Sequence, residues 1–219
     1  MKDTMLLAIP YRDREEHLKL FLPTIKEYLK KSEIKYKILI VEQADGKAFN
    51  RAKLLNVAFA HTEGKYGWYC FHDVDMLPIV SNYKKCKFPT HLATNAEQFG
   101  YKMPYDYYFG GVTMFNPESF VKINGYSNNY WGWGAEDDDV YFRCLKMKVD
   151  VLRDYGRYRS LDHERKIFKH EYDKNIKTLK VYDKSFKDGE FKEGLSTLEF
   201  SVLNTEIISK KVTKITVDI

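Results

Sequence analysis

The first half of the chain alternates strand and helix patterns, and this alternation restricts the fold more than any other feature. Apolar runs at Met5–Ile9, Tyr36–Val41 and Trp68–Phe71 have the length of buried strands. Between them, Arg14–Lys31 and Phe49–His61 have helical periodicity. Strands that alternate with helices form a parallel sheet covered by helices. We therefore predict an α/β fold with a Rossmann-like, mostly parallel central sheet.

The helix predicted at Arg14–Lys31 carries an apolar stripe that would face this sheet. The stripe consists of Leu18, Phe21, Leu22, Ile25 and Leu29. Pro23 lies inside the same stretch, and it predicts a kink or a break because proline lacks the amide hydrogen that a helix needs.

The second half has a less regular pattern. Its predicted elements are a strand at Gly111–Phe115, helices at Pro117–Ile123 and Glu136–Lys148, and strands at Leu198–Leu203 and Val212–Val217. The segment Asn124–Ala135 is rich in turn formers and tryptophan, which indicates a loop. The sequence contains no repeat and no linker, so we predict a single domain over residues 1–219.

Charged residues follow each of the three predicted strands of the first half. Arg12 and Arg14 follow the first strand, Glu42 and Gln43 lead from the second towards Arg51, and Asp73 and Asp75 follow the third. Parallel strands end at one edge of their sheet, and ligands of such folds bind beyond that edge. This coincidence predicts a functional site there.

Asp73 and Asp75 flank Val74 directly after the third strand. Carboxylate oxygens at a strand end suit Mg²⁺ or Mn²⁺, and either ion can also bind the phosphates of a substrate. Aspartate is also common in ordinary turns, so this pair predicts a metal site only in combination with its position.

Four acidic residues, Glu136–Asp139, open the predicted helix after the sequence Trp131-Gly132-Trp133-Gly134. Carboxylates at a helix start are favoured by the helix dipole, but four in succession repel one another. Successive helical residues turn by about 100°, so at most two of them can face one site. The pattern suits a sugar hydroxyl docked on tryptophan beside a carboxylate that acts as general base.

Two other polar side chains have an ambiguous setting in the sequence. Arg51 lies near a helix start, where it could bind a phosphate or form a surface ion pair. His163 follows Asp162 in a polar segment, where it would be either an exposed side chain or a metal ligand.

Composition excludes several other classes of protein. The net charge of +5 is spread along the chain, and the lysine-rich stretch 166–192 lacks the pattern of a nucleic-acid module, so we expect no nucleic-acid partner. Three cysteines without a CxxC motif favour reduced thiols, with Cys70–Cys86 as the one plausible bridge. No apolar run is long enough to span a bilayer, and no signal peptide is visible, so a soluble, cytoplasmic protein is expected.

Several blocks of the sequence together resemble the catalytic domain of the β-1,4-galactosyltransferases. The blocks are PYRDREEHL at 10–18, FNRAKLLN at 49–56, HDVDMLP at 72–78, YFGG at 108–111, NGYSNNYWGWGAEDDD at 124–139 and KITVDI at 214–219. They span almost the whole chain in order, and the long block at 124–139 is highly specific.

The resemblance implies a GT-A-type domain in which residues 1–78 form a nucleotide-binding half and residues 79–219 form an acceptor-binding half with the metal loop. It also implies a role for each matching residue. Residues implied to bind the nucleotide sugar are Pro10, Tyr11, Arg12, Arg14, Phe49, Arg51, Asp73, Val74, Tyr108, Gly111 and Trp133. Residues implied at the acceptor are Tyr105, Trp133, Asp137 and Asp138, with Asp137 as the base and Glu136 beside it. Asp75 and His163 would be ligands of Mn²⁺, with Mg²⁺ as the alternative.

The chain departs from the family pattern at two of these places. The family's metal-ligating methionine, three residues before the histidine, is replaced by Ser160, and Asp162 is a second candidate for that role. The family half-cystine five residues before the first aspartate of the DVD motif is replaced by Trp68.

The expected activity is inverting transfer of galactose from UDP-galactose to a hydroxyl of N-acetylglucosamine, xylose or glucose, with a β-1,4 linkage. Tyr108 occupies a position where tyrosine accompanies galactose donors and a smaller residue accompanies N-acetylgalactosamine. The alternatives are a UDP-N-acetylgalactosamine transferase, a non-catalytic sugar-binding derivative, or a metal-dependent phosphohydrolase of nucleotide sugars. The sequence assigns no oligomeric state.

Overall fold

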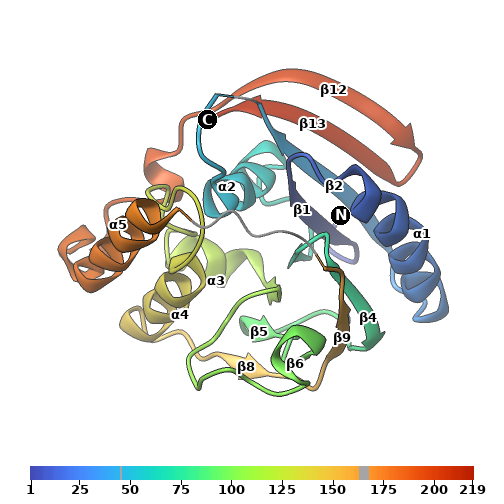
Figure 1. Cartoon of the computed structure of the whole chain (residues 1–219), viewed down its shortest axis with the longest axis horizontal. Coiled ribbons are helices and arrows are strands. Elements are labelled where there is room, and N and C mark those ends of the chain that lie inside the picture. The colour runs from blue at the N-terminus through green and yellow to red at the C-terminus, as the bar shows by residue number, and fades with distance from the viewer. Residues whose placement is uncertain (45, 163–167) are drawn as a thin grey trace.

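The computed structural model describes residues 1–44, 46–162 and 168–219. Within these residues the centre of the fold is an eight-stranded sheet with the order β12-β13-β2-β1-β3-β7-β5-β8 (Figure 1). Its strands are β1 (Met5–Tyr11), β2 (Tyr36–Gln43), β3 (Trp68–His72), β5 (Thr90–His91), β7 (Val112–Phe115), β8 (Leu152–Arg153), β12 (Ser201–Ser209) and β13 (Val212–Asp218).

The middle of this sheet is parallel, as the sequence predicts. β1 pairs in parallel with β2 on one side and β3 on the other, and β13 pairs in parallel with β2. β7 then runs antiparallel to β3. Because β1, β2 and β3 point the same way, the charged residues that follow them meet at one edge of the sheet.

Each face of the sheet has its own hydrophobic core, and alternate residues of β1 contribute to the two cores. Met5, Leu7 and Ile9 pack with α1 (Glu15–Lys31), whereas Leu6 and Ala8 pack with the opposite layer. That layer contains α2 (Arg51–His61), α3 (Pro117–Lys122) and α4 (Glu136–Lys146). The period of two along β1 therefore assigns each side chain to one layer.

Helix α1 is continuous through Pro23, so the predicted break is wrong. The carbonyl group that loses its donor belongs to Lys19, and both residues lie on the exposed side of the helix. Water can solvate that carbonyl group, while Phe21, Ile25 and Leu29 remain buried against the sheet. The predicted apolar stripe is thus confirmed.

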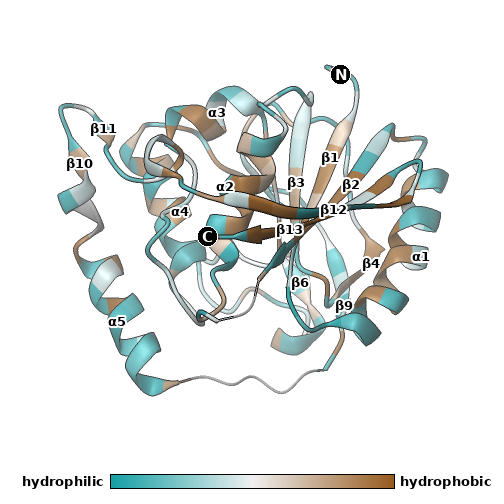
Figure 2. Ribbon diagram, turned by 90° about the horizontal axis from the view of Figure 1, so that it is seen from above, coloured by the Kyte–Doolittle hydropathy of each residue, from teal (hydrophilic) through white to brown (hydrophobic). Residues whose placement is uncertain are grey.

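Smaller elements surround the central layers. A three-stranded sheet has the order β4-β9-β6, formed by β4 (Met76–Val80), β9 (Arg157–Ser160) and β6 (Asn95–Ala96). Helix α5 (Lys169–Lys180) lies beside α4 on the side of the molecule opposite α1 (Figures 1 and 2). The remaining elements are β10 (Phe186–Lys187), β11 (Glu190–Phe191) and 3₁₀ helices at Glu97–Phe99, Tyr182–Ser185 and Leu195–Thr197.

Hydropathy follows these layers. The central strands carry much of the hydrophobic colour, whereas α5 is largely hydrophilic (Figure 2). Within the described ranges, no helix has both the length and the apolar character needed to span a bilayer. Cys70, Cys86 and Cys144 are buried free thiols, so the Cys70–Cys86 bridge is not formed.

Candidate active site

Arg51 joins the DVD motif to the acidic start of α4. Its Nε donates to Asp73 Oδ1 at 2.6 Å, and its Nη1 donates to Asp137 Oδ1 at 2.8 Å. Glu136 Oε1 lies 3.9 Å from the same Nη1. The Arg51 side chain is only 11% exposed, so water screens these charges weakly. The structure thus brings together two acidic motifs that lie far apart in the sequence.

The start of α2 places Arg51 at this junction. Asn50 is the N-cap residue, and its side chain accepts a hydrogen bond from the Lys53 amide at 2.8 Å. The Asn50 amide in turn donates to the side chain of Gln43 at 2.8 Å, which ties the helix start to the end of β2. The guanidinium group therefore projects from a fixed helix end.

Two further asparagines connect α2 to the loop that precedes α4. Buried Asn56 donates to Asn128 Oδ1 at 2.9 Å and accepts from the Tyr126 amide at 2.9 Å. Asn50 Nδ2 donates to the carbonyl group of Asn128 at 2.9 Å. Asn50 and Asn56 lie within the block 49–56 and Asn128 within the block 124–139, but their hydrogen bonds to each other could not be predicted from the sequence.

Burial raises the pKa of Asp137 well above its usual value, and the nearby Arg51 charge opposes that rise. The neighbouring carboxylates Glu136 and Asp73 raise the Asp137 pKa further. The pKa of Glu136 is also raised, again mainly by burial. A carboxyl group with a raised pKa is a stronger proton acceptor than an ordinary aspartate, which suits a general base.

Arg51 also has an unused hydrogen-bond donor. Within the part of the chain that the structure describes, its Nη2 is a buried polar atom without a hydrogen-bond partner. Burial alone would lower the pKa of this guanidinium group, but the charges of Asp137 and Asp73 raise it. Buried donors without a partner are rare in folded proteins, and an anionic ligand would satisfy this one.

The tyrosine-rich segment 105–111 packs beside Asp137 and Asp138. Tyr105 donates from its hydroxyl group to Asp138 Oδ1 at 3.0 Å. The rings of Tyr105 and Tyr108 lie 5.6 Å apart, and Tyr108 is almost fully buried. A Cβ atom on Gly110 would clash with Asp137 Oδ2 and with the Tyr108 ring, so glycine allows the close approach. The structure places Tyr105, Tyr108 and both aspartates in one region.

His91 and Arg153 hold this segment through hydrogen bonds to its main chain. His91 Nε2 donates to the Gly110 carbonyl group at 2.9 Å, while its Nδ1 accepts from Arg153 Nη1 at 2.9 Å. Arg153 also donates to the Tyr108 carbonyl group at 2.6 Å. Burial lowers the pKa of His91 to about 3, so the ring stays neutral. Neither residue could be assigned from the sequence, because their partners are mostly main-chain atoms.

The DVD motif is fixed to the same segment through its backbone. The Asp73 amide donates to the Gly111 carbonyl group at 2.9 Å, and Val74 is buried in the core. His72 is fully buried, with its Nδ1 2.9 Å from the Asp73 carbonyl oxygen and its Nε2 2.9 Å from the Tyr83 hydroxyl group. These contacts orient Asp73 towards Arg51.

Asp75 lies beside the chain that leads to the predicted metal-ligating histidine. β4 and β9 pair antiparallel with Met76 opposite Ser160, and the Leu161 amide donates to the Asp75 carbonyl group at 2.8 Å. His163 itself lies outside the described residues. The pairing of β4 with β9 nevertheless brings the Asp75 backbone next to Leu161, which precedes His163 by two residues.

The oxygen ligands available near Asp75 suit a divalent cation that also binds substrate phosphates. Among residues 1–44, 46–162 and 168–219, no group of three His, Cys, Asp or Glu side chains is placed to hold an ion alone. Mg²⁺ and Mn²⁺ sites are commonly built from one or two carboxylates plus phosphate oxygens, so Asp75 with a neighbouring ligand fits this chemistry. The Ser160 hydroxyl group accepts from the Gln98 amide at 3.2 Å, and the Asp162 carbonyl oxygen lies 3.2 Å from His17 Nε2.

Trp133 lies on a loop between α5 and the residues near Arg51. It is 47% exposed, and its ring stacks on Tyr172 of α5 with centroids 5.7 Å apart. On the opposite side of the loop, the Gly132 amide donates to the Phe49 carbonyl group at 2.8 Å. An exposed indole in a fixed loop offers a flat apolar surface on which a sugar ring can pack.

Asp139, the fourth acidic residue, belongs to a buried structural network. Arg143 Nε donates to Asp139 Oδ2 at 2.7 Å, and Arg143 Nη2 donates to Glu193 Oε2 at 2.8 Å. The Tyr130 hydroxyl group donates to Asp139 Oδ1 at 3.2 Å. Glu136 and Asp137 therefore face Arg51, whereas Asp138 faces Tyr105 and Asp139 faces the core, as the helical turn requires.

Replacing Asp139 with Asn is expected to lower the free energy of unfolding by about 2 kcal/mol, because a charge-assisted hydrogen bond to buried Arg143 is lost. Urea unfolding followed by circular dichroism measures this difference. The exposed residue Asp150 provides the control, and Asp150→Asn should change stability by less than about 0.5 kcal/mol. Equal stability of the two variants would contradict a structural role for Asp139.

Several predicted nucleotide-binding residues lie near the end of β1, and they occupy two separate places in the structure. The Arg12 guanidinium group lies 5.4 Å from the centre of the Phe49 ring, and its Nη1 donates to the Lys47 carbonyl group at 2.7 Å. Arg14 is the residue before α1, and Pro10 is buried within β1. Arg12 and Phe49 thus form one surface next to the start of α2.

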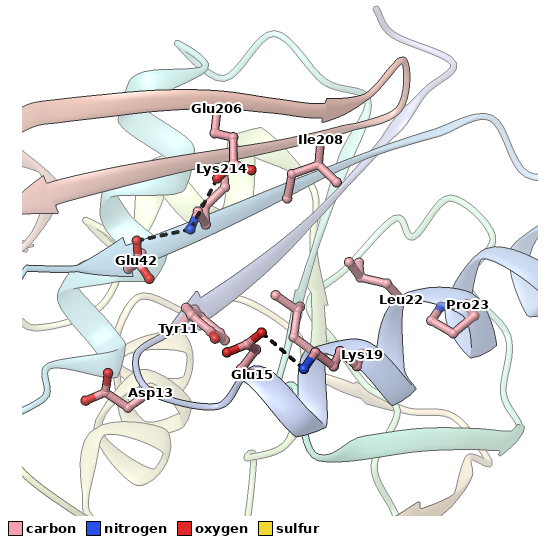
Figure 3. Close-up of a pocket in the computed structure, with 11 residues that line it drawn as sticks. Tyr11, Asp13, Glu15, Lys19, Leu22, Pro23, Glu42, Glu206, Ile208 and Lys214 are labelled. Atoms are coloured by element: carbon pink, nitrogen blue, oxygen red, sulfur yellow. Dashed lines mark ion pairs between the residues drawn. The ribbon is translucent and has the colours of Figure 1, made fainter.

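Tyr11 lines a separate groove of about 640 Å³ between α1 and the β12–β13 hairpin (Figure 3). On the sheet side of this groove, Glu42 and Glu206 form ion pairs with Lys214 at 3.5 and 3.3 Å. None of Arg51, Asp73 and Asp137 lines it. The structure therefore does not bring the Tyr11 ring to the carboxylate cluster, and its nucleotide-binding role stays a prediction.

Two family models match the chain. Residues 1–87 match the N-terminal region of glycosyl transferase group 7, and residues 90–166 match a model described as the N-terminal domain of galactosyltransferase. Human β-1,4-galactosyltransferase 4 is 36% identical over 207 residues, which is 91% of this chain and 59% of the relative. Bovine β-1,4-galactosyltransferase 1 is 37% identical over 222 residues, which is 97% of this chain and 54% of the relative. The chain thus spans somewhat more than half the length of these relatives.

Solved structures resemble the whole fold. The catalytic domain of Drosophila β1,4-galactosyltransferase 7 in complex with xylobiose has a TM-score of 0.79 at 29% identity, covering 99% of this chain and 94% of that chain. A mutant of the same enzyme in complex with manganese, UDP-Gal and xylobiose has a TM-score of 0.76 at 28% identity, with the same coverage. The fold is therefore of the GT-A type, as predicted. Because both family models match in order and the two relatives are 36% and 37% identical over 91% and 97% of the chain, the chain belongs to the β-1,4-galactosyltransferase family of glycosyltransferases.

Proposed function

We propose that this protein transfers galactose from UDP-galactose to a hydroxyl group of a carbohydrate acceptor, with inversion at the anomeric carbon. The observation that carries the proposal is the convergence of Asp73, Arg51 and Asp137 at the carboxyl edge of the sheet. It joins residues of the predicted nucleotide-binding half, 1–78, to residues of the predicted acceptor-binding half, 79–219. The Drosophila relative bound to manganese, UDP-Gal and xylobiose supports the same assignment.

The donor would lie across the sheet edge between Arg12 and Asp73. Arg51 Nη2 is the buried donor that a diphosphate oxygen would satisfy. Asp75, with His163 and either Ser160 or Asp162, would hold Mn²⁺, with Mg²⁺ as the alternative. When bound, the ion neutralises negative charge that develops on the departing UDP.

Asp137 would act on the acceptor. Its raised pKa and its position beside Tyr108 and Asp138 allow it to take the proton from the attacking hydroxyl group. Asp138 and Tyr105, already hydrogen-bonded to each other, would orient the acceptor while Trp133 packs on its ring. A single displacement inverts the anomeric centre, so the protein needs no nucleophile of its own.

The direct test is incubation with UDP-galactose, Mn²⁺ and separate acceptors that carry N-acetylglucosamine, xylose or glucose. We expect one acceptor to give a β-1,4-linked product, identified by NMR, and UDP release that depends on Mn²⁺. Release of free galactose at the same rate with and without acceptor would instead indicate a hydrolase. Binding of sugar without UDP release would indicate a non-catalytic derivative.

Tyr108 is expected to select the donor. The side chain fills the space beside Gly110 and Gly111, where the C2 substituent of the donor sugar would lie. Tyr108→Leu removes the phenol, and it should improve the use of UDP-N-acetylgalactosamine relative to UDP-galactose by about tenfold. Competition between the two donors, with products resolved by mass spectrometry, measures the ratio. An unchanged ratio would remove Tyr108 from the donor site.

A further inference from the structure

Helix α5 holds the loop Trp131–Gly134, here called the Trp loop, through one buried amide. Asn175 is 1% exposed, and its Nδ2 donates to the carbonyl oxygens of Trp131 at 3.0 Å and Trp133 at 3.3 Å. One side-chain amide thus contacts both tryptophans of the loop through their main chain. Asn175 is buried, whereas the other residues of α5 are partly or fully exposed.

Two further contacts join the same surfaces. The Tyr172 ring stacks on the Trp133 ring with an interplanar angle of 29°. The Gly132 backbone has a φ of 76°, and a Cβ atom on this residue would clash with the Glu171 carboxylate. The glycine therefore permits the left-handed turn, and it leaves room for the Glu171 side chain against the loop. The opposite edge of the loop is fixed by the hydrogen bond from Gly132 to the Phe49 carbonyl group.

We infer that Asn175 and Tyr172 are positioning residues that hold the Trp loop, and with it the Trp133 ring, in its acceptor-binding arrangement. This inference rests on the proposed function only in naming the acceptor as the ligand of Trp133. Asn175 fixes the loop backbone, and Tyr172 fixes the rotation of the indole. Because the two residues lie one turn apart on α5, a single helix controls both.

Kinetics separate this role from general stabilisation. Asn175→Asp keeps the shape of the side chain but removes both amide hydrogens, so the two carbonyl oxygens lose their donor. We expect the KM for the sugar acceptor to rise about tenfold, while the KM for UDP-galactose changes by less than about threefold. Tyr172→Ala should act in the same direction, and Tyr172→Phe, which keeps the ring, should restore the wild-type value.

Tryptophan fluorescence gives a second readout that needs no activity. Trp68 is buried and Trp133 is half exposed, so acrylamide quenching of the native protein reports mainly on the Trp loop. Asn175→Asp and Tyr172→Ala should increase the quenching constant. Thr178→Ala, which removes only a hydrogen bond within α5 to the Lys174 carbonyl group, should leave both quenching and acceptor KM unchanged.

The outcomes distinguish the inference from the proposed function. If the wild-type protein transfers no sugar, the proposed function fails, and quenching alone decides whether Asn175 holds the loop. Unchanged quenching and acceptor KM in Asn175→Asp and Tyr172→Ala would overturn the inference. Equal effects in Thr178→Ala, or a parallel rise of donor and acceptor KM, would overturn it too, because α5 would then act only through stability. If Asn175→Asp does not fold, the partly exposed Tyr172 variants carry the test.

Discussion

Replacing Asp137 with Asn is expected to reduce sugar transfer by a factor of roughly 10²–10⁴ while UDP-galactose still binds. Asparagine keeps the oxygen that accepts from Arg51 but cannot take the proton of the acceptor hydroxyl group. Single-turnover transfer assays measure the loss, and calorimetric titration with UDP-galactose and Mn²⁺ measures donor binding. Near-normal turnover by this variant would exclude Asp137 as the base.

The pH dependence of the wild-type protein should reflect the same group. Asp137 must be ionised to accept a proton, and burial raises its pKa. The value of kcat/KM should therefore fall as the pH decreases, and the fall should begin at a higher pH than an ordinary aspartate would give. A profile that stays flat down to the range of an exposed aspartate would contradict this assignment.

Asp137→Asn should lose activity without losing stability. A carboxyl group whose pKa is raised in the folded state stabilises the fold at low pH, and this contribution is lost as the pH rises through the folded pKa. Once ionised, Asp137 is therefore less favourable for folding than a neutral side chain of the same shape. Arg51 keeps its ion pair with Asp73 in Asp137→Asn, so no buried charge is left unpaired, and the thermal midpoint measured by calorimetry should be no lower than that of the wild-type protein. Its loss of activity then cannot come from unfolding.

Replacing Arg51 with Gln is expected to have a large effect on both stability and donor binding. The change leaves Asp73 and Asp137 without their cation while Glu136 remains close by. Removing one partner of a buried ion pair costs about 3–5 kcal/mol of unfolding free energy, which corresponds to a thermal midpoint lower by roughly 6–20 °C. The same variant removes the Nη2 donor, so binding of UDP-galactose should weaken at least tenfold.

Two comparisons make the Arg51 result interpretable. Arg51→Lys keeps the charge but not the planar fork, so its stability should lie between those of the wild type and Arg51→Gln. Lys65→Gln removes an exposed ion pair with Glu63 and should cost less than about 1 kcal/mol. If Arg51→Gln is no less stable than Lys65→Gln, the buried cluster does not stabilise the fold as the geometry indicates.

The parallel core was predictable because its strands are buried on both faces. β1, β2 and β3 are continuous apolar runs, and the blocks around Arg51, Asp73 and Asp137 mark the site. What the sequence does not contain is the contact between them. Arg51 lies 22 residues from Asp73 and 86 from Asp137 along the chain, so local spacing says nothing about their hydrogen bonds.

The peripheral elements were harder to predict, each for a physical reason. β12 is exposed along its whole length and has register shifts, so it lacks an alternating pattern, and the predicted strand Leu198–Leu203 begins and ends too early. β4 contains Pro78, which argues against a strand, but β4 lies at the edge of its sheet, where a missing amide hydrogen is tolerated. α5 buries Asn175 instead of an apolar stripe, so helical periodicity could not reveal it.

The hydrogen bond from Gly132 to the Phe49 carbonyl group has a consequence for how variation can act on this fold. Both partners are main-chain atoms, so a substitution at position 49 can alter the aromatic ring without removing the hydrogen bond. A change that removes the amide hydrogen of residue 132, such as an amide-to-ester replacement or Gly132→Pro, would remove the hydrogen bond. The contact between the Trp loop and the start of α2 can therefore persist while the side chains around it vary.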